Sequence, residues 1–154
     1  MIFVTVGTTM PFDELIEAMD NFKKAGTVED HILCQIGNGT YIPTMCEYFR
    51  FKPGLKQYLD QASVVVGHGG TGTVLSMLKE KKAFVAVVNP RAADRHQSQF
   101  LSRLGLETDL LWTENLAQIP ELISKALNTT RTEALSMPRL ADDLRMVLIR
   151  LRSI

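Results

Sequence analysis

The sequence has few cysteines, no excess charge of either sign and no long apolar run. Its only cysteines are Cys34 and Cys46, too few for a structural zinc site, which needs four ligands. Lys and Arg together number 17, as do Asp and Glu, so no overall field favours nucleic acid or an anionic lipid surface. No segment reaches the ~20 apolar residues of a membrane-spanning helix. No basic leader precedes the apolar N-terminal run, so we expect a soluble, cytoplasmic protein.

Several common catalytic motifs are also missing. There is no Gly-x4-Gly-Lys-Ser/Thr, which excludes a P-loop. A dinucleotide site needs Gly-x-Gly-x-x-Gly after the first strand, but residues 7–11 read Gly-Thr-Thr-Met-Pro, so we expect neither NAD nor FAD. No Gly-x-Ser-x-Gly elbow is present. His31, His68 and His96 lack the spacing of metal ligands, and we expect no metal and no cofactor.

What the chain does contain is an alternation of strand-like runs and amphipathic helices. With 154 residues, 45% of them hydrophobic, it fits one domain with a core of its own. Apolar runs predict strands at residues 2–6, 32–36, 47–51, 64–66, 83–88 and 109–112. Apolar residues at helical spacing predict helices at 12–24, 53–62, 73–79, 94–104 and 114–127. We expect Gly105 to close the fourth helix, Thr113 to cap the fifth and Pro120 to interrupt it.

This alternation predicts an α/β fold, a Rossmann-like parallel sheet with helices on both faces. Ligands of such sheets bind beyond the carboxyl ends of the strands. We expect turns that begin at Gly7, Gly67 and Asn89 to meet at that edge and to share one cleft.

Residues 64–73, Val-Val-Val-Gly-His-Gly-Gly-Thr-Gly-Thr, form the most informative stretch. A buried strand runs into a glycine-rich turn, and a helix follows. Backbone N–H groups at a helix N-terminus bind anions, most often nucleotide phosphates, and the histidine and two threonines add donors. The alternative is a tight turn that needs glycine for its backbone angles. One glycine would meet that need, whereas four within six residues favour a phosphate site.

The loop after the strand at 83–88 carries a second polar group. Its residues are Asp94, Arg95, His96 and Gln97. This mixture of acceptors and donors suits several hydroxyl groups, as on a sugar. The alternative is a helix cap made by Asp94 beside a solvated His96 and Gln97. Arg91 and Arg95 either add positive charge near a phosphate or are ordinary surface cations.

Three stretches together resemble a known family. They are Val-Thr-Val-Gly-Thr-Thr-Met-Pro-Phe-Asp-Glu-Leu-Ile at 4–16, Val-Gly-His-Gly-Gly-Thr-Gly-Thr-Val at 66–74 and Asp-Arg-His-Gln at 94–97. In this order they resemble the C-terminal domain of family 28 glycosyltransferases of the GT-B fold. The similarity is greatest to its stand-alone branch of Alg13-like and PssE-like subunits, and it covers about residues 1–127.

The resemblance implies a donor-binding catalytic subunit that moves a hexose from a UDP-sugar to a lipid-linked acceptor, as in exopolysaccharide or lipid-linked oligosaccharide synthesis. It implies that His68 is catalytic, stabilising the leaving UDP with the helix N-terminus. The donor-binding residues it implies are Gly7, Thr8, Gly69, Gly70, Thr71, Gly72, Thr73, Ser76, Asp94, His96 and Gln97. Two-domain members usually carry a glutamate for the ribose at the position of Ser76, where the stand-alone branch often has a hydroxyl residue.

A complete GT-B enzyme needs two such domains, on the order of twice this length. The resemblance therefore implies a membrane-anchored Alg14-like or PssD-like partner that binds the acceptor and holds this chain at the membrane surface. No metal is required, because the amides and helix dipole can stabilise the diphosphate. Two alternatives remain open. One is a non-catalytic, nucleotide-sugar-binding enhancer of a separate glycosyltransferase, and the other is an interaction module that binds no UDP.

The C-terminal part differs from the rest. Residues 1–127 predict the UDP-sugar domain, 128–137 a polar linker and 138–152 an amphipathic helix. The apolar stripe of that helix consists of Leu140, Leu144, Val147, Leu148 and Leu151. The helix either packs on its own domain or docks on the membrane subunit, or on a second copy when that subunit is absent.

Overall fold

The structure is a computed structural model, and it describes residues 1–92 and 96–133. Its strands are β1 (Ile2–Thr5), β2 (Ile32–Gln35), β3 (Glu47–Phe49), β4 (Val64–His68), β5 (Phe84–Val87) and β6 (Leu111–Thr113). Its helices are α1 (Asp13–Lys24), α2 (Lys56–Gln61), α3 (Thr71–Lys79), α4 (His96–Glu107), the 3-10 turn η1 (Leu116–Gln118) and α5 (Ile119–Glu133). None of the helices in the described part is long and apolar enough to cross a membrane.

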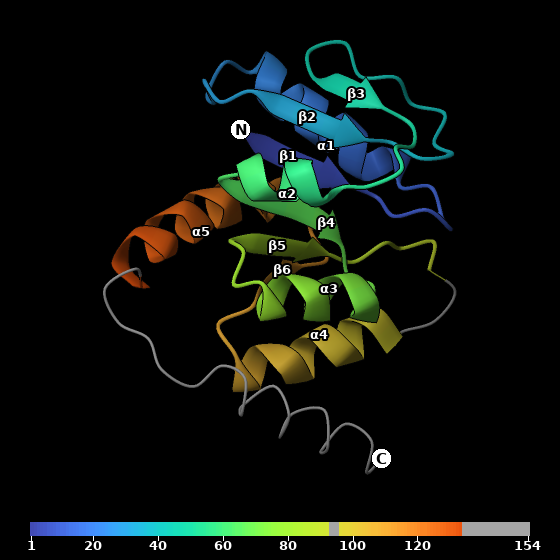
Figure 1. Cartoon of the computed structure of the whole chain (residues 1–154). Helices are drawn as coiled ribbons and strands as arrows, with labels where there is room; N and C mark the ends of the chain where they lie inside the picture. The colour runs from blue at the N-terminus through green and yellow to red at the C-terminus, as the bar shows by residue number, and fades with distance from the viewer. Residues whose placement is uncertain (93–95, 134–154) are drawn as a thin grey trace.

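All six strands are parallel and follow the order β3-β2-β1-β4-β5-β6. This order confirms the predicted Rossmann-like sheet. The chain moves outward from β1 to β3 and then returns to place β4 on the other side of β1 (Figure 1). The crevice between the carboxyl ends of β1 and β4 is therefore the point where such sheets bind ligands.

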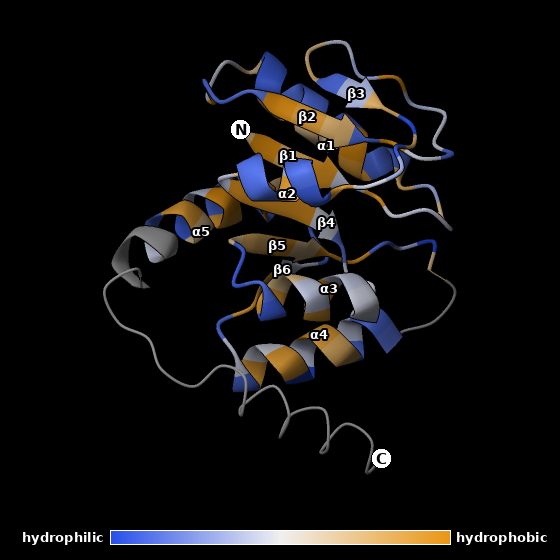
Figure 2. Ribbon diagram, viewed as in Figure 1, coloured by the Kyte–Doolittle hydropathy of each residue, from blue (hydrophilic) through white to orange (hydrophobic). Residues whose placement is uncertain are grey.

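Helices cover both faces of the sheet, as predicted. On one face Val4 and Val66 of the sheet pack with Leu15 of α1 and Ile123 of α5. On the other face Phe3, Val65, Val74 of α3 and Leu101 of α4 share a second core. The strands at the centre are almost wholly apolar, and the outward surfaces of α1 and α2 are polar (Figure 2). Burial on both faces explains why these strands read as continuous apolar runs.

Several predicted element boundaries are wrong. The helix after β4 begins at Thr71, two residues earlier than expected. Gly105 does not close α4, which continues to Glu107, and a Cβ on Gly105 would lie 3.0 Å from the Trp112 Nε1. Glycine there permits the close approach of helix and strand.

Further errors concern the helix expected at 114–127. Thr113 is the end of β6, and Asn115 caps η1 by accepting the N–H of Ala117. Pro120 lies in the first turn of α5, where its missing N–H is not needed, so it begins the helix instead of interrupting it. The same helix continues to Glu133, so residues 128–133 are helical and not linker. The expected helix at 138–152 lies outside the described residues.

Two carboxylates of α1 hold the loop between β2 and β3. The buried Asp20 accepts hydrogen bonds from the backbone N–H groups of residues 44–46 at 2.7–3.1 Å and from the Tyr41 hydroxyl at 2.9 Å. Asp13 accepts from the N–H and hydroxyl of Thr40 at 2.9 and 2.6 Å. Burial raises the pKa of Asp20, but these hydrogen bonds outweigh it and hold the pKa below its ordinary value.

Candidate functional site

The N-terminus of α3 presents three free backbone N–H groups at the carboxyl edge of the sheet. The turn itself is only Gly69–Gly70, because Gly67 belongs to β4 and Gly72 to α3. The N–H of Gly69 bonds to the Val87 carbonyl and that of Gly70 to the His68 Nδ1. The N–H groups of residues 71–73 make no hydrogen bond within the described part of the chain. They can therefore bind an anion with the help of the helix dipole.

The His68 imidazole occupies the crevice between β1 and β4. A Cβ on Gly7 would lie 2.6 Å from its Nε2, and a Cβ on Gly70 would overlap its Cε1. Gly7 also has a φ of +77°, which side-chain-bearing residues rarely adopt. A side chain at either position would clash with the His68 ring. Both glycines are therefore needed for the ring to take this position, whatever ligand is bound. By contrast, a Cβ on Gly72 would meet no atom within 4 Å, so open space lies beside the free amides.

The hydrogen bonds of His68 define its protonation. Burial lowers its pKa from the ordinary 6.5, so the ring is neutral at pH 7. Its Nδ1 accepts the Gly70 N–H at 3.1 Å, which assigns the ring proton to Nε2. Nε2 then donates to the Thr73 Oγ1 at 3.3 Å. The Thr73 hydroxyl keeps its own proton to donate to a ligand, and His68 acts as a donor that orients this hydroxyl.

The loops after β1, β4 and β5 lie side by side. Gln97 of α4 accepts the N–H of Asn89 at 3.3 Å through its Oε1, which also lies 3.6 Å from where a Cβ on Gly69 would stand. The buried Asn89 donates its Nδ2 to the Pro11 carbonyl at 3.1 Å. These contacts leave the Gln97 amide nitrogen as a donor near the N-terminus of α3. Asp94 lies outside the described residues.

Other residues from the sequence prediction lie further from this centre or are already paired. Arg91 bonds to Glu14 through its Nε at 3.0 Å and Nη2 at 2.8 Å, so in this conformation its charge is committed to a carboxylate. Ser76 is exposed, and its hydroxyl donates to the Glu80 Oε1 at 3.5 Å, away from the free amides. Thr8 and His96 are exposed at the carboxyl edge.

One residue at this edge was missed by the sequence analysis. Gln35, at the end of β2, is 2% exposed and bonds to Thr5 and to the carbonyls of Gly7 and Arg50. Its position as the one polar residue of the run Ile-Leu-Cys-Gln-Ile was the only available signal. The hydrogen-bond partners of Gln35 are distant in sequence, so the local pattern indicates only that the strand ends near this residue.

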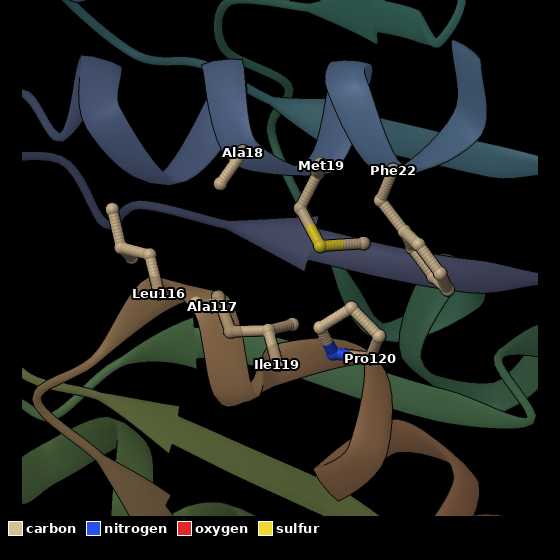
Figure 3. Close-up of a pocket in the computed structure, with 7 residues that line it drawn as sticks. All are labelled: Ala18, Met19, Phe22, Leu116, Ala117, Ile119 and Pro120. Carbon is tan, nitrogen blue, oxygen red and sulfur yellow. The ribbon is translucent and has the colours of Figure 1, made fainter. Parts of the chain in front are cut away.

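Hollows also lie elsewhere in the described residues, and one of about 380 Å³ is lined by Ser98, Gln99, Ser102, Arg103, Trp112 and Glu114. No three His, Cys, Asp or Glu side chains gather in the described ranges 1–92 and 96–133. A hollow of about 250 Å³ lies between α1 and the start of α5 (Figure 3). Its lining residues are all apolar: Ala18, Met19, Phe22, Leu116, Ala117, Ile119 and Pro120. Such a lining offers nothing to a diphosphate, and it lies away from the loops that carry the free amides.

Known proteins resemble this chain in sequence. Three of them are UDP-N-acetylglucosamine transferase subunits ALG13. That of Mus musculus is 34% identical over 121 residues and that of Homo sapiens 33% over 122 residues. That of Yarrowia lipolytica is 30% identical over 124 residues. The matches cover 71%, 72% and 72% of this chain. The chain spans only 10% and 11% of the mouse and human proteins and 63% of the yeast one.

Solved structures resemble it in fold. Acinetobacter baumannii MurG superposes with a TM-score of 0.60 at 18% identity, covering 99% of this chain and 49% of MurG. An NMR structure of ALG13 gives 0.50 at 18% identity, with 86% and 85% covered. The model of the glycosyltransferase family 28 C-terminal domain matches residues 1–143. This chain therefore belongs to the glycosyltransferase family 28 C-terminal domain family.

Proposed function

We propose that this chain is the donor-binding catalytic subunit of a two-component glycosyltransferase. It takes a sugar from a UDP-sugar and, with a partner, transfers it to a lipid-linked acceptor. The observation that carries the proposal is the set of three free N–H groups at residues 71–73, beside a neutral His68. Membership of a glycosyltransferase family and relatives named UDP-N-acetylglucosamine transferase subunits support the substrate class.

The arrangement suits the charge that develops in the reaction. When the bond between the sugar and the β-phosphate breaks, its electron pair moves to a phosphate oxygen and negative charge grows there. The amides of residues 71–73 and the dipole of α3 stabilise that charge without a metal ion. The Thr73 hydroxyl, oriented by His68 Nε2, donates a further hydrogen bond. Gln97, His96 and Asp94 recognise the sugar and its phosphate.

The partner supplies what the described residues do not offer. The chain aligns with 49% of MurG, which is the share expected of one of two domains. We propose that a membrane-anchored, Alg14-like or PssD-like subunit binds the lipid acceptor and provides the general base. This chain then works on the cytoplasmic side, held at the membrane surface by that subunit.

Calorimetric titration of the full chain with UDP tests the donor site. Binding is expected, and ligand at ~100 times its Kd adds about 2.7 kcal/mol to the free energy of unfolding. Thr73→Val weakens binding, because it removes the oriented hydroxyl but keeps the shape. Ser98→Ala on α4 is the control and leaves the Kd unchanged. Absence of binding at millimolar UDP contradicts the proposal.

Turnover with the partner separates catalysis from enhancement. In the co-purified complex, His68→Ala is expected to lower kcat by about a hundredfold, because it removes the group that orients the Thr73 hydroxyl, a donor to the transition state. A fall of only a few-fold, with UDP binding retained, favours the alternative function of a non-catalytic enhancer that binds nucleotide-sugar for a separate transferase.

A further inference from the structure

Gln35 and Thr5 form a buried polar pair in a layer that is otherwise apolar. They stand opposite each other on β2 and β1, and the same layer continues to Phe49 on β3 and Gly67 on β4. Gln35 is 2% and Thr5 6% exposed. Side chains of this layer face the core under α2 and α3, because Phe3, two residues before Thr5, lies there. Polar groups are costly at such a position unless they are hydrogen-bonded.

The side-chain amide of Gln35 makes three hydrogen bonds. Its Oε1 accepts the Thr5 hydroxyl at 2.7 Å. Its Nε2 donates one hydrogen to the Gly7 carbonyl at 3.2 Å and the other to the Arg50 carbonyl at 3.1 Å. One side chain thus joins the carboxyl ends of β1, β2 and β3. Without this side chain the Gly7 and Arg50 carbonyls would lose a donor, so its hydrogen bonds both stabilise the fold and fix the geometry of the three strand ends.

The hydrogen bond from Gln35 to the Gly7 carbonyl fixes the orientation of the peptide between Gly7 and Thr8. The carbonyl of this peptide points at Gln35, and in a trans peptide the N–H points the opposite way. The Thr8 N–H is therefore turned away from Gln35, and it makes no hydrogen bond within the described residues. Space for the carbonyl is kept by Gly37, since a Cβ there would lie 3.1 Å from the Gly7 oxygen.

We propose that Gln35 is a positioning residue of the donor site. By fixing the Gly7 carbonyl, it presents the Thr8 N–H to the crevice as a further donor for a phosphate oxygen, and it holds Gly7 against the His68 ring. The crevice then has N–H groups on both sides, from the loop after β1 and from the N-terminus of α3. This inference rests on the proposed function.

Two variants of the full chain separate positioning from stability. Gln35→Met keeps the length of the side chain but removes the hydrogen bond to Gly7. Thr5→Val, the matched control, damages the same buried pair and leaves the Nε2 donors in place. Both are expected to lower the unfolding midpoint. UDP affinity falls about tenfold in Gln35→Met, equal to about 1.4 kcal/mol, and less than about threefold in Thr5→Val.

The free protein gives a second measurement that needs no ligand. In ¹H–¹⁵N and imidazole NMR spectra, Gln35→Met is expected to shift the Thr8 amide and the His68 ring protons, whereas Thr5→Val leaves both near their original positions. If Gln35→Met does not fold, Gln35→Leu replaces it, because leucine is also apolar and offers no donor to Gly7.

The outcomes are distinct. If the wild-type chain binds UDP and both variants lose affinity equally, Gln35 has only a structural role and the inference is overturned. Unchanged Thr8 and His68 resonances in the Gln35 variant overturn it as well. If the wild-type chain binds no UDP but these resonances move selectively, the positioning effect stands and the proposed function fails.

Discussion

Among the described residues, backbone N–H groups point to an anion position both in the loop between β2 and β3 and at the start of α3, and the two places differ in whether a nearby side chain supplies the anion. In the loop between β2 and β3, the N–H groups of residues 44–46 surround the carboxylate of Asp20. At the start of α3, those of residues 71–73 surround open space. The N–H groups of the first position lie 24 to 26 residues from the carboxylate in sequence, and the second position has no acidic residue in the first turn of its helix.

This difference indicates different roles for the two groups of N–H donors. Where the chain supplies its own anion, the N–H groups fix a loop and are closed to ligands. Where it supplies none, they stay available, and the free helix terminus is stabilised only when an external anion binds. In the proposed function, this anion is the diphosphate of a sugar nucleotide.

Removing the internal anion has the largest expected effect. Asp20→Asn leaves one oxygen in place of two and turns an amide group toward N–H donors, so unfolding becomes easier by about 3 kcal/mol. Urea unfolding measures this change. UDP affinity stays unchanged, because the loop is far from α3. Asp60→Asn, which alters an exposed ion pair with Lys56, is the control and leaves the midpoint where it was. Equal midpoints for Asp20→Asn and wild type contradict the assigned role.

Supplying an anion at the open position is the reverse experiment. Gly72→Asp places a carboxylate in the first turn of α3, where a side chain meets no atom within 4 Å. It is expected to stabilise the free protein by about 1 kcal/mol and to weaken UDP binding by at least about tenfold. Gly72→Ala gains the helix propensity alone and keeps the affinity within about threefold. Thermal melts and calorimetry read both effects. Tight UDP binding by the aspartate variant shows that the phosphates lie elsewhere.

The pH dependence of stability gives the smallest of these effects. Burial raises the pKa of Asp20 and its hydrogen bonds lower it, with a net fall below 3.8. The unfolded chain then binds the proton more readily, so the contribution of Asp20 is complete above about pH 4 and is lost as the pH falls through the folded pKa. Urea midpoints measured from about pH 3 to 7 are expected to slope downward at the acid end. Asp20→Asn is expected to flatten this slope. An unchanged slope in this variant contradicts the assignment of the acid-end loss of stability to the Asp20 carboxylate.

The sheet and its helices were predictable because they depend on local patterns. Runs such as Val64–Val66 are buried on both faces, and each predicted strand is present in the sheet. Helix ends were harder. Pro120 lies in the first turn of α5, directly after η1, and Gly105 lies inside α4, where a Cβ would come close to Trp112. The approach of Trp112 is not visible in a sequence window.

The candidate site was predictable as a location but not as a set of contacts. The pattern around Gly69 pointed to the correct edge of the sheet. It did not show that Gly7 and Gly70 are needed to seat His68, since Gly7 lies far away in sequence. Gln35 and Asp20 were missed for the same reason, because each is polar in an apolar pattern and its partners come from other elements.

An NMR titration of the ¹⁵N-labelled full chain with UDP tests the central claim most directly. The amides of Thr71, Gly72 and Thr73 are expected to show the largest shifts, because a phosphate oxygen accepts their hydrogen bonds. The amides of residues 44–46, already bonded to Asp20, are the internal control and stay in place. Saturable shifts confined to the first group support the account. Millimolar UDP that leaves residues 71–73 unmoved, or that moves residues 44–46 instead, contradicts it.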